Sequence, residues 1–320
     1  MHNGYKLLLF SFALGAATAH AQDYPNRPVR LIVPYTPGGQ PDNIARTLAG
    51  PISAALGQSL VIENRPGAGG LPGVQEAMRA APDGYTLLSA DAAQWAILPA
   101  LRPGVYDFEK SFAPISLIYT SALYIQVRSS VAAKTIQELI ALAKSKPGSL
   151  SYGSAGNGTV HHLFMESFKS ALGLDIVHVP YKGSGQMVQA LLAGDIQIGI
   201  TATASTGPHL KTGAIRLLAT TTKDRSRLTP DIISQGELGF PEHNFAGESA
   251  YFAPTGTPRP IIDKISGILA KAVVVPDVVQ RAETFGVEML HRNPEQTLQI
   301  MRADVARFVK AVKISGAKAE

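Results

Sequence analysis

LIVPYTPGGQPD, from Leu31 to Asp42, carries the strongest structural signal in this chain of 320 residues. Its apolar, β-branched start is typical of a buried strand, and its Pro/Gly-rich remainder is typical of a turn. Behind the turn, apolar residues recur at four-residue spacing along one helix face, at Ile44, Leu48, Ile52 and Leu56. The stretch therefore predicts a strand, a glycine turn and a helix in direct succession.

Pro41 and Asp42 suit the first turn of that helix. Proline gives up no hydrogen bond there, and the aspartate charge meets the positive end of the helix dipole. A strand, a glycine turn and a helix start together direct unpaired backbone N–H groups at one point, which is how a protein holds an anion without a metal. We interpret the turn as a candidate carboxylate or phosphate site; an ordinary βα turn is the alternative that these residues leave open.

The N-terminus has the pattern of a secretory signal. Lys6 supplies the positive charge, Leu7 to Ala19 the apolar stretch, and Ala19-His20-Ala21 the small-x-small cleavage site. The apolar stretch is shorter than the roughly 18–20 residues of a membrane span, and no later segment is long and apolar enough. We expect residues 1–21 to be removed near Ala21 and the mature chain to be exported and soluble.

Composition narrows the function classes. The formal charge of +5 comes from scattered basic residues, without a basic block or an aromatic stripe, so nucleic acid is not an expected partner. The chain has no cysteine, which excludes disulfides and thiolate chemistry. About 300 mature residues suffice for two α/β lobes.

Apolar runs alternate with helical patterns, which predicts βαβ units and mostly parallel sheets with helices on both faces. The expected helices are residues 75–80, 136–143, 162–171 and 187–192, and the expected strands are residues 29–33, 60–62, 85–88, 117–127, 176–179, 196–200 and 215–220.

The C-terminal part is helical in pattern. Pro258 and Pro294 stand where helices begin, and the second of these helices shows a stripe of Leu298, Met301, Val305, Phe308 and Val312. No repeat or linker separates two lobes, so strands near 121–127 and 245–251 are expected to cross between them. This gives a first lobe of residues 23–122 completed by 247–320, and a second lobe of residues 123–246.

A second glycine turn, SYGSAGNGT from Ser151 to Thr159, follows a strand-like start and precedes the helix expected from His162. Two facing turns, one from each lobe, would clamp a single carboxylate, with hydroxyl groups from Ser154 and Thr159. A flexible surface turn is the alternative.

The remaining motifs are weaker evidence for a function. Gly67 and Gly69 begin a G-x-G-x-x-G pattern, but Pro72 stands at its third glycine position, so no nucleotide cofactor is expected. No recognised nucleophile or zinc motif is present, and we expect no enzyme, cofactor or metal site. The adjacent His161 and His162 point in different directions on a helix, and we expect His162 to bond the glycine turn instead.

Nine phrases in this order resemble one family, the Bug or TctC-type receptors, which are periplasmic solute-binding components of tripartite tricarboxylate transporters. The phrases are YPNRP from Tyr24, PGGQPD from Pro37, ENRPGAGG from Glu63, APDGYTLL from Ala81, FAPISL from Phe112, SAGNGT from Ser154, HVPYKG from His178, APTGTP from Ala253 and SGAK from Ser315. The resemblance implies a two-lobed Venus-flytrap fold, each lobe a mixed sheet flanked by helices, in a periplasmic monomer.

The resemblance also implies that both glycine turns hold the near carboxylate of the ligand. Carried over to this chain, the clamp is Thr36, Gly38 and Gly39 with Ser154, Gly156, Asn157 and Thr159. Tyr181, after a predicted strand, and Ser205 complete the candidates, with a surface turn as the alternative for Tyr181.

Three departures from the family pattern bear on the ligand. Thr201 stands where many relatives have an acid that would suit an ammonium group, which argues against an amino acid. Trp95, the only tryptophan, is expected in a loop facing the cleft, where an aromatic wall would favour a flat ligand; core packing is the alternative. Glu248 stands where relatives often have an aromatic residue, and it either meets a ligand donor or faces water.

The resulting hypothesis is a binding protein for a small organic carboxylate, a dicarboxylate or an aromatic acid, that delivers it to the membrane subunits of a tripartite tricarboxylate transporter. A ligand-dependent sensor arm that docks on a membrane histidine kinase needs the same cleft and is the main alternative. An exported enzyme is the third, and it lacks a recognisable nucleophile and base.

Overall fold

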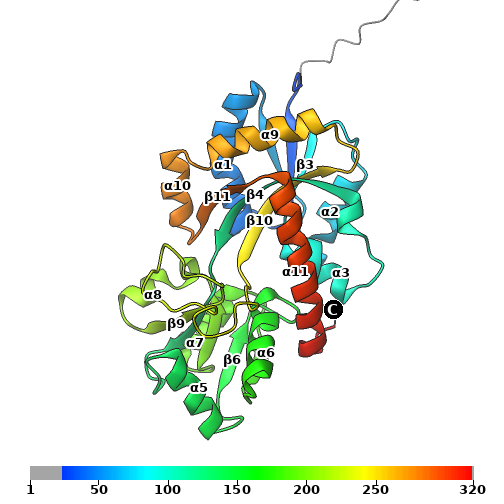
Figure 1. The fold of residues 1–320 in the computed structure, drawn as a ribbon. Helices are drawn as coiled ribbons and strands as arrows, with labels where there is room; N and C mark the ends of the chain where they lie inside the picture. The colour runs from blue at the N-terminus through cyan, green and yellow to red at the C-terminus, as the bar shows by residue number, and fades with distance from the viewer. Residues whose placement is uncertain (1–23, 319–320) are drawn as a thin grey trace, which may run out of the picture.

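The chain builds two mixed sheets, each flanked by helices, in the computed structural model, which describes residues 24–318 (Figure 1). The predicted signal segment and its cleavage site lie outside the described residues. Among residues 24–318 no helix is both long enough and apolar enough to cross a bilayer.

The first sheet takes strands from both ends of the chain, in the order β11-β4-β10-β3-β1-β2. Its strands are β1 (Val29–Val33), β2 (Leu60–Asn64), β3 (Thr86–Asp91), β4 (Phe112–Ser121), β10 (Gly247–Pro254) and β11 (Glu288–Arg292). β1 is parallel to β2 and β3, whereas β10 is antiparallel to β3 and β4.

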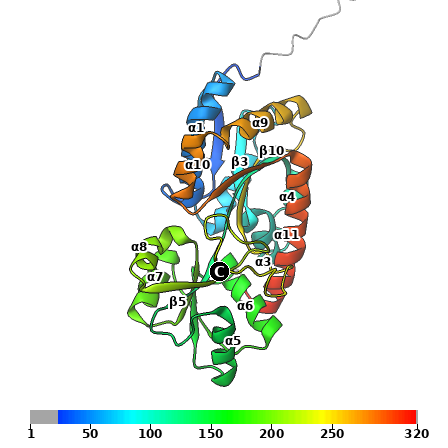
Figure 2. The same ribbon diagram turned by 60° about the vertical axis from the view of Figure 1, so that its left-hand side comes forward.

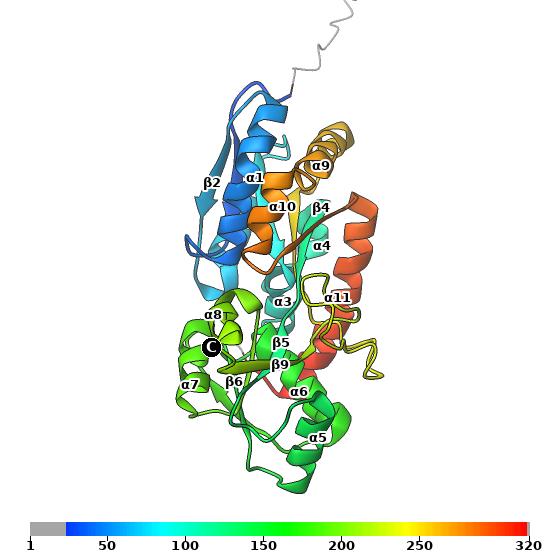
Figure 3. The same cartoon turned by 90° about the vertical axis from the view of Figure 1, so that its left-hand side faces the viewer.

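Helices cover both faces of this sheet. The helices α1 (Gln40–Leu56), α9 (Arg259–Ala272) and α10 (Pro276–Glu283) lie on one face of the sheet, and α11 (Pro294–Ser315) lies on the other (Figure 3). Buried residues of α2 (Leu71–Met78) belong to the same apolar cluster as those of α11. The shorter helical segments are η1 (Ala68–Gly70), η2 (Ala93–Ile97), α3 (Leu98–Leu101) and α4 (Phe108–Ser111).

The second sheet has the order β7-β6-β8-β5-β9. It consists of β5 (Tyr124–Arg128), β6 (Ser151–Ser154), β7 (Val177–Pro180), β8 (Ile198–Thr201) and β9 (Ile215–Thr220). Its helical segments are α5 (Ile136–Ser145), α6 (Val160–Leu172), α7 (Ser184–Ala193), η3 (Thr203–Ser205) and α8 (Gly207–Lys211).

Two predictions about the strands need correction. The expected strand over residues 117–127 is two strands, β4 and β5, which end up in different sheets because the chain passes between the lobes at Ala122 and Leu123. The sheets are mixed rather than mostly parallel, since β5 and β10, which follow the crossings, run antiparallel to their neighbours.

The predicted stripe of α11 is correct only in part. Met301 and Phe308 are buried, but Val305 is 38% exposed, and the buried face includes Thr297 and Asp304 instead. The helix thus turns a carboxylate inward, which apolar periodicity does not reveal.

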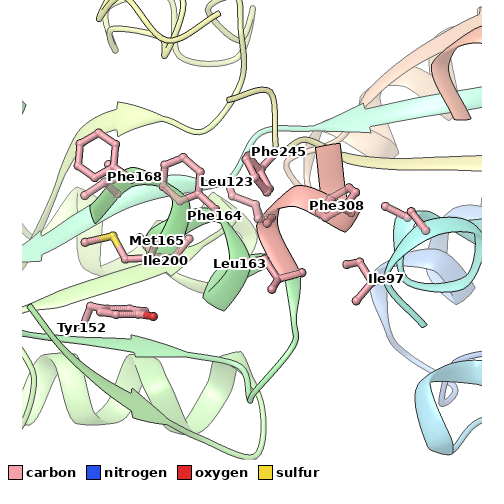
Figure 4. Packing of buried hydrophobic residues seen from close by; sticks show 14 of the residues in the cluster. Ile97, Leu123, Tyr152, Leu163, Phe164, Met165, Phe168, Ile200, Phe245 and Phe308 are labelled. Carbon is pink, nitrogen blue, oxygen red and sulfur yellow. The ribbon is translucent and has the colours of Figure 1, made fainter. Parts of the chain in front are cut away.

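α11 also joins the lobes, reaching from the first sheet to α6 of the second (Figure 2). The Phe245 ring lies between them, with its centroid 5.3 Å from that of Phe308 on α11 and 5.6 Å from that of Phe164 on α6 (Figure 4). One continuous apolar cluster therefore includes residues of both lobes.

Candidate functional site

A cavity of about 960 Å³ lies between the lobes. Residues that follow the carboxyl ends of β1, β3 and β8 line it, as expected for a ligand site in this type of α/β architecture. Of the residues predicted from the sequence, the cavity wall includes Thr36, Gly38, Asn157, Thr159, Thr201, Ser205 and Glu248.

Five of the predicted residues do not line the cavity: Gly39, Trp95, Ser154, Gly156 and Tyr181. All but Trp95 lie in or beside the glycine turns, where their groups hold the turns together. Tyr181 packs against the small apolar cluster of α7, and its backbone N–H donates to the Ser154 carbonyl oxygen at 3.1 Å.

In the first glycine turn, the glycine N–H groups already have partners. Gly38, at φ +83°, donates its N–H to Oδ2 of Asp42 at 2.8 Å, and Gly39 donates to the Thr36 carbonyl oxygen at 3.3 Å. The positive φ favours glycine at position 38. Free donors are found one step further on, because the backbone N–H of Gln40 has no hydrogen-bond partner among residues 24–318.

Asp42 organises this turn. The side chain is buried, and its carboxylate accepts hydrogen bonds from Nε of Arg46 at 3.0 Å and Nδ2 of Asn64 at 2.9 Å, besides the Gly38 N–H. Burial acts to raise the pKa of Asp42, but these hydrogen bonds together lower it below its usual value. The aspartate predicted for the helix dipole is thus also the anchor of the turn.

The second glycine turn is held by hydroxyl and imidazole groups. The Ser154 hydroxyl donates to the Gly156 carbonyl oxygen at 3.1 Å and shares a 2.7 Å hydrogen bond with Nε2 of His178. Thr159 donates its hydroxyl to the same carbonyl oxygen at 2.7 Å. The expectation that both hydroxyls meet the ligand is corrected for Ser154, which is fully buried inside the turn.

His162 performs the structural role predicted for it. Its Nδ1 accepts the backbone N–H of Gly158 at 3.1 Å, and its ring stacks on His178 with centroids 4.2 Å apart. His161 instead lines the cavity; burial lowers its pKa to about 4, and its buried Nδ1 has no partner among the described residues. A neutral imidazole in the wall is a site feature that the sequence reasoning missed.

The first turns of α1 and α6 therefore form opposite walls of one cavity. Gln40 begins α1, Val160 begins α6, and both line the cavity. Like Gln40, Val160 has a backbone N–H without a partner among residues 24–318. Two helix N-termini with open donors are an arrangement that can bind an anion.

Trp95 is a core residue, not an aromatic wall. Its indole Nε1–H donates to Oδ2 of the buried Asp304 at 3.0 Å, and its ring lies 5.8 Å from that of Phe252. The side chain is 2% exposed. The reason is η2, a π-helical turn that directs Trp95 toward α11 and Gln94 toward the cavity.

Asp91, Tyr35 and Gln94 are cavity-wall residues that the sequence reasoning did not select. Asp91 ends β3, and a carboxylate at the carboxyl end of a parallel strand is the signal that could have identified it. Burial raises the pKa of Asp91, as it does that of Glu248. Among the described residues no group of three or more side chains is arranged to hold a metal ion.

Comparison with known proteins gives consistent results. The family model "Tripartite tricarboxylate transporter family receptor" matches residues 44–316. The protein BugT of Bordetella pertussis is 33% identical over 305 residues, which are 95% of this chain and 94% of that protein.

Two similar solved structures are named with the ligand that they contain. Rpa4515 of R. palustris with adipate is 31% identical, with a TM-score of 0.78, covering 92% of this chain and 99% of that one. MatC from Rhodopseudomonas palustris with bound malate is 28% identical, with a TM-score of 0.74, covering 90% and 100%.

Proposed function

This chain belongs to the tripartite tricarboxylate transporter receptor family, and from that premise we propose that it binds a small organic carboxylate between its lobes. The observation that supports the proposal is the pair of open helix N-termini, α1 and α6, on opposite walls of one cavity. Backbone N–H groups and helix dipoles together favour an anionic group at that point.

The proposed ligands are small organic carboxylates rather than anions in general. Adipate and malate in the structures of relatives favour a carboxylate of few carbons over a phosphate. Dicarboxylates and aromatic acids are the first compounds to test, because the cavity continues beyond the helix starts along Ile97, Leu98 and Leu101.

In the same proposal, the protein acts in the periplasm and delivers its ligand to the membrane subunits of a tripartite tricarboxylate transporter. Residues 23–122 and 247–320 move as one lobe and residues 123–246 as the other. The crossing at Ala122 and Leu123 supports this division. Ligand must bind the closed form more tightly than the open one to shift the equilibrium, so small-angle scattering should show a smaller radius of gyration with ligand.

The sharpest test removes one N–H at a time. Gln40→Pro deletes the N1 donor of α1, and Val160→Pro deletes the N1 donor of α6. Proline is well tolerated at N1. The residues before it, Gly39 at φ −68°, ψ 163° and Thr159 at φ −72°, ψ 159°, already have the extended conformation that proline requires.

Gln40→Ala and Val160→Ala are the matched controls, because they change the side chain and keep the N–H. By isothermal titration calorimetry with a carboxylate panel, each proline variant should lose roughly ten- to hundredfold in affinity, as for one hydrogen bond to a charged group. The alanine variants should lose much less. Equal affinity of the proline and alanine variants at both helices would refute the two-helix clamp.

A further inference from the structure

Asp91 is a carboxylate held in the cavity wall by neutral groups alone. Its Oδ1 accepts the backbone N–H of Ala93 at 2.8 Å, and its Oδ2 accepts the Tyr35 hydroxyl at 2.5 Å. The residue is half-buried and lines the cavity. Each carboxylate oxygen can accept a second hydrogen bond, so the group can still bind a donor.

A second layer of contacts fixes this arrangement. The fully buried Gln94 donates from Nε2 to the Tyr35 hydroxyl oxygen at 3.2 Å and to the Gly69 carbonyl oxygen at 3.1 Å. Its Oε1 accepts the backbone N–H of Asp91 at 3.0 Å. A chain of hydrogen bonds therefore runs from Gln94 through Tyr35 to Asp91, each group donating to the next. This chain holds the Asp91 carboxylate as an acceptor at the cavity surface.

No cation of the described chain pairs with Asp91. Three other buried or half-buried carboxylates have an arginine partner: Asp42 with Arg46, Glu63 with Arg30, and Asp304 with Arg307. Asp91 has no ion pair among residues 24–318, and burial raises its pKa. Removing an unpaired carboxylate from water is unfavourable, so a cationic ligand group would gain a full charge interaction there.

Asp91 and the turn before α1 lie at the ends of adjacent strands of the first sheet. β1 and β3 are parallel neighbours with Ile32 beside Leu88, so Tyr35 and Asp91 follow the carboxyl ends of adjacent strands. Adjacent strands are about 4.8 Å apart. Asp91 and Gln40, the first residue of α1, line the same cavity, so one ligand can direct a different group toward each.

We propose that Asp91 binds an ammonium group of the ligand, so that the ligand is an amino-substituted carboxylate rather than a plain acid. The proposal rests on the carboxylate-binding function above. Thr201, whose lack of an acid argued against an amino acid, lies in the other lobe, and Asp91 supplies the acid from the first. Glu248 is a weaker candidate, because no hydrogen bond within residues 24–318 fixes its carboxylate and because the charges of Asp304, Arg307 and Arg292 all act on it.

The test is calorimetric titration of the full mature chain, after unfolding and refolding to remove any co-purified ligand. The probes are matched sets at neutral pH: succinate, malate and aspartate; glutarate and glutamate; propionate and β-alanine. At least one amino acid should bind ten- to hundredfold more tightly than its plain and hydroxy counterparts. Asp91→Asn should abolish that preference, mainly by weakening the amino acid.

Glu248→Gln is the matched control, since it neutralises the other acid in the cavity wall and should leave the preference unchanged. Three outcomes overturn the proposal: plain acids bind best in the native chain, the hydroxy acid binds as well as the amino acid, or Glu248→Gln removes the preference while Asp91→Asn does not. In each of these the carboxylate-binding function stands. Absence of binding by every probe, with or without an amino group, would count against that function itself.

Discussion

The glycine turns before α1 and α6 do the same task with different chemistry. The turn before α1 is held by a buried carboxylate, Asp42, which is supported by Arg46 and Asn64. The turn before α6 is held by neutral groups, the stacked rings of His162 and His178 and the Ser154 hydroxyl. In both turns, a side chain of the following helix accepts a hydrogen bond from a glycine N–H, Asp42 from Gly38 and His162 from Gly158. This hydrogen bond holds the turn in the conformation that leaves the N–H groups at the helix start open.

Asp42→Ala should have the largest effect on stability. It leaves the Gly38 N–H, Asn64 and Arg46 without their shared acceptor, and we expect a loss of about 2–3 kcal/mol in the free energy of unfolding by urea denaturation. Asp263→Ala removes the equally spaced but exposed partner of Arg259 and should change little. If both variants lose the same amount, Asp42 is not a special anchor.

His162→Phe should have the next largest effect, in the other turn. It keeps an aromatic ring for stacking but removes the acceptor of the buried Gly158 N–H, so a loss of about 1–2 kcal/mol is expected. The same denaturation experiment measures it. His209→Phe, at a helix position of the second lobe, is the control; stability of His162→Phe equal to that of the native chain would show that the Gly158 contact is dispensable.

Acidification should separate the two turns. Burial and the neighbouring His162 lower the pKa of His178 to about 4, so the folded state favours its neutral form. Its stabilising contribution is complete above its ordinary pKa of about 6.5 and is lost as pH falls toward 4. Asp42, with a lowered pKa, keeps its contribution until still lower pH.

Hydrogen exchange, corrected for intrinsic rates, should therefore show residues 154–162 opening more between pH 7 and 5, with residues 36–44 unchanged. His178→Phe should reduce that pH dependence. An equal response of both turns would contradict the difference in chemistry.

Arg46→Met should have the smallest effect. The arginine side chain is 50% exposed, so solvent screens its pair with Asp42, and the loss should stay below about 1 kcal/mol. A loss as large as that of Asp42→Ala would mean that the ion pair, and not the hydrogen bonds from Gly38 and Asn64, holds the first turn. Urea denaturation of the two variants side by side decides between these interpretations.

Much of the fold was predictable because it depends on local patterns. β1 and β9 have the predicted bounds, α1 buries the predicted apolar stripe, and a helix begins just after Pro258 as expected. The crossing strand expected near residues 245–251 is β10, which extends further, to Pro254. β11 was missed, since its edge position leaves no alternation or long apolar run. The continuous strand over residues 117–127 was wrong because nothing in its apolar run marks where one sheet ends and the next begins.

The location of the site could be predicted from the sequence, but the groups that are open to a ligand could not. Both glycine turns face one cavity, and Thr36, Asn157 and Thr159 line it. Which groups remain open to a ligand depended on side chains further along the chain. The Asp42 carboxylate accepts the hydrogen bond of the Gly38 N–H, and His178 shares a hydrogen bond with the Ser154 hydroxyl. Neither group is therefore open to a ligand.

Spacing, turn residues and capping positions in the sequence were enough to predict the strand–turn–helix units and the approximate helix starts, because those features depend on residues within a few positions of each other. The family was indicated by the resemblance of nine short phrases. The tertiary structure alone determined the polar lining of the cavity. Trp95 turns inward to meet Asp304, 209 positions away, and Asp91 meets Tyr35 across 56 positions. Hydrogen-bond partners so distant in the chain are brought together only by packing, so local pattern could not predict the polar wall of the cavity.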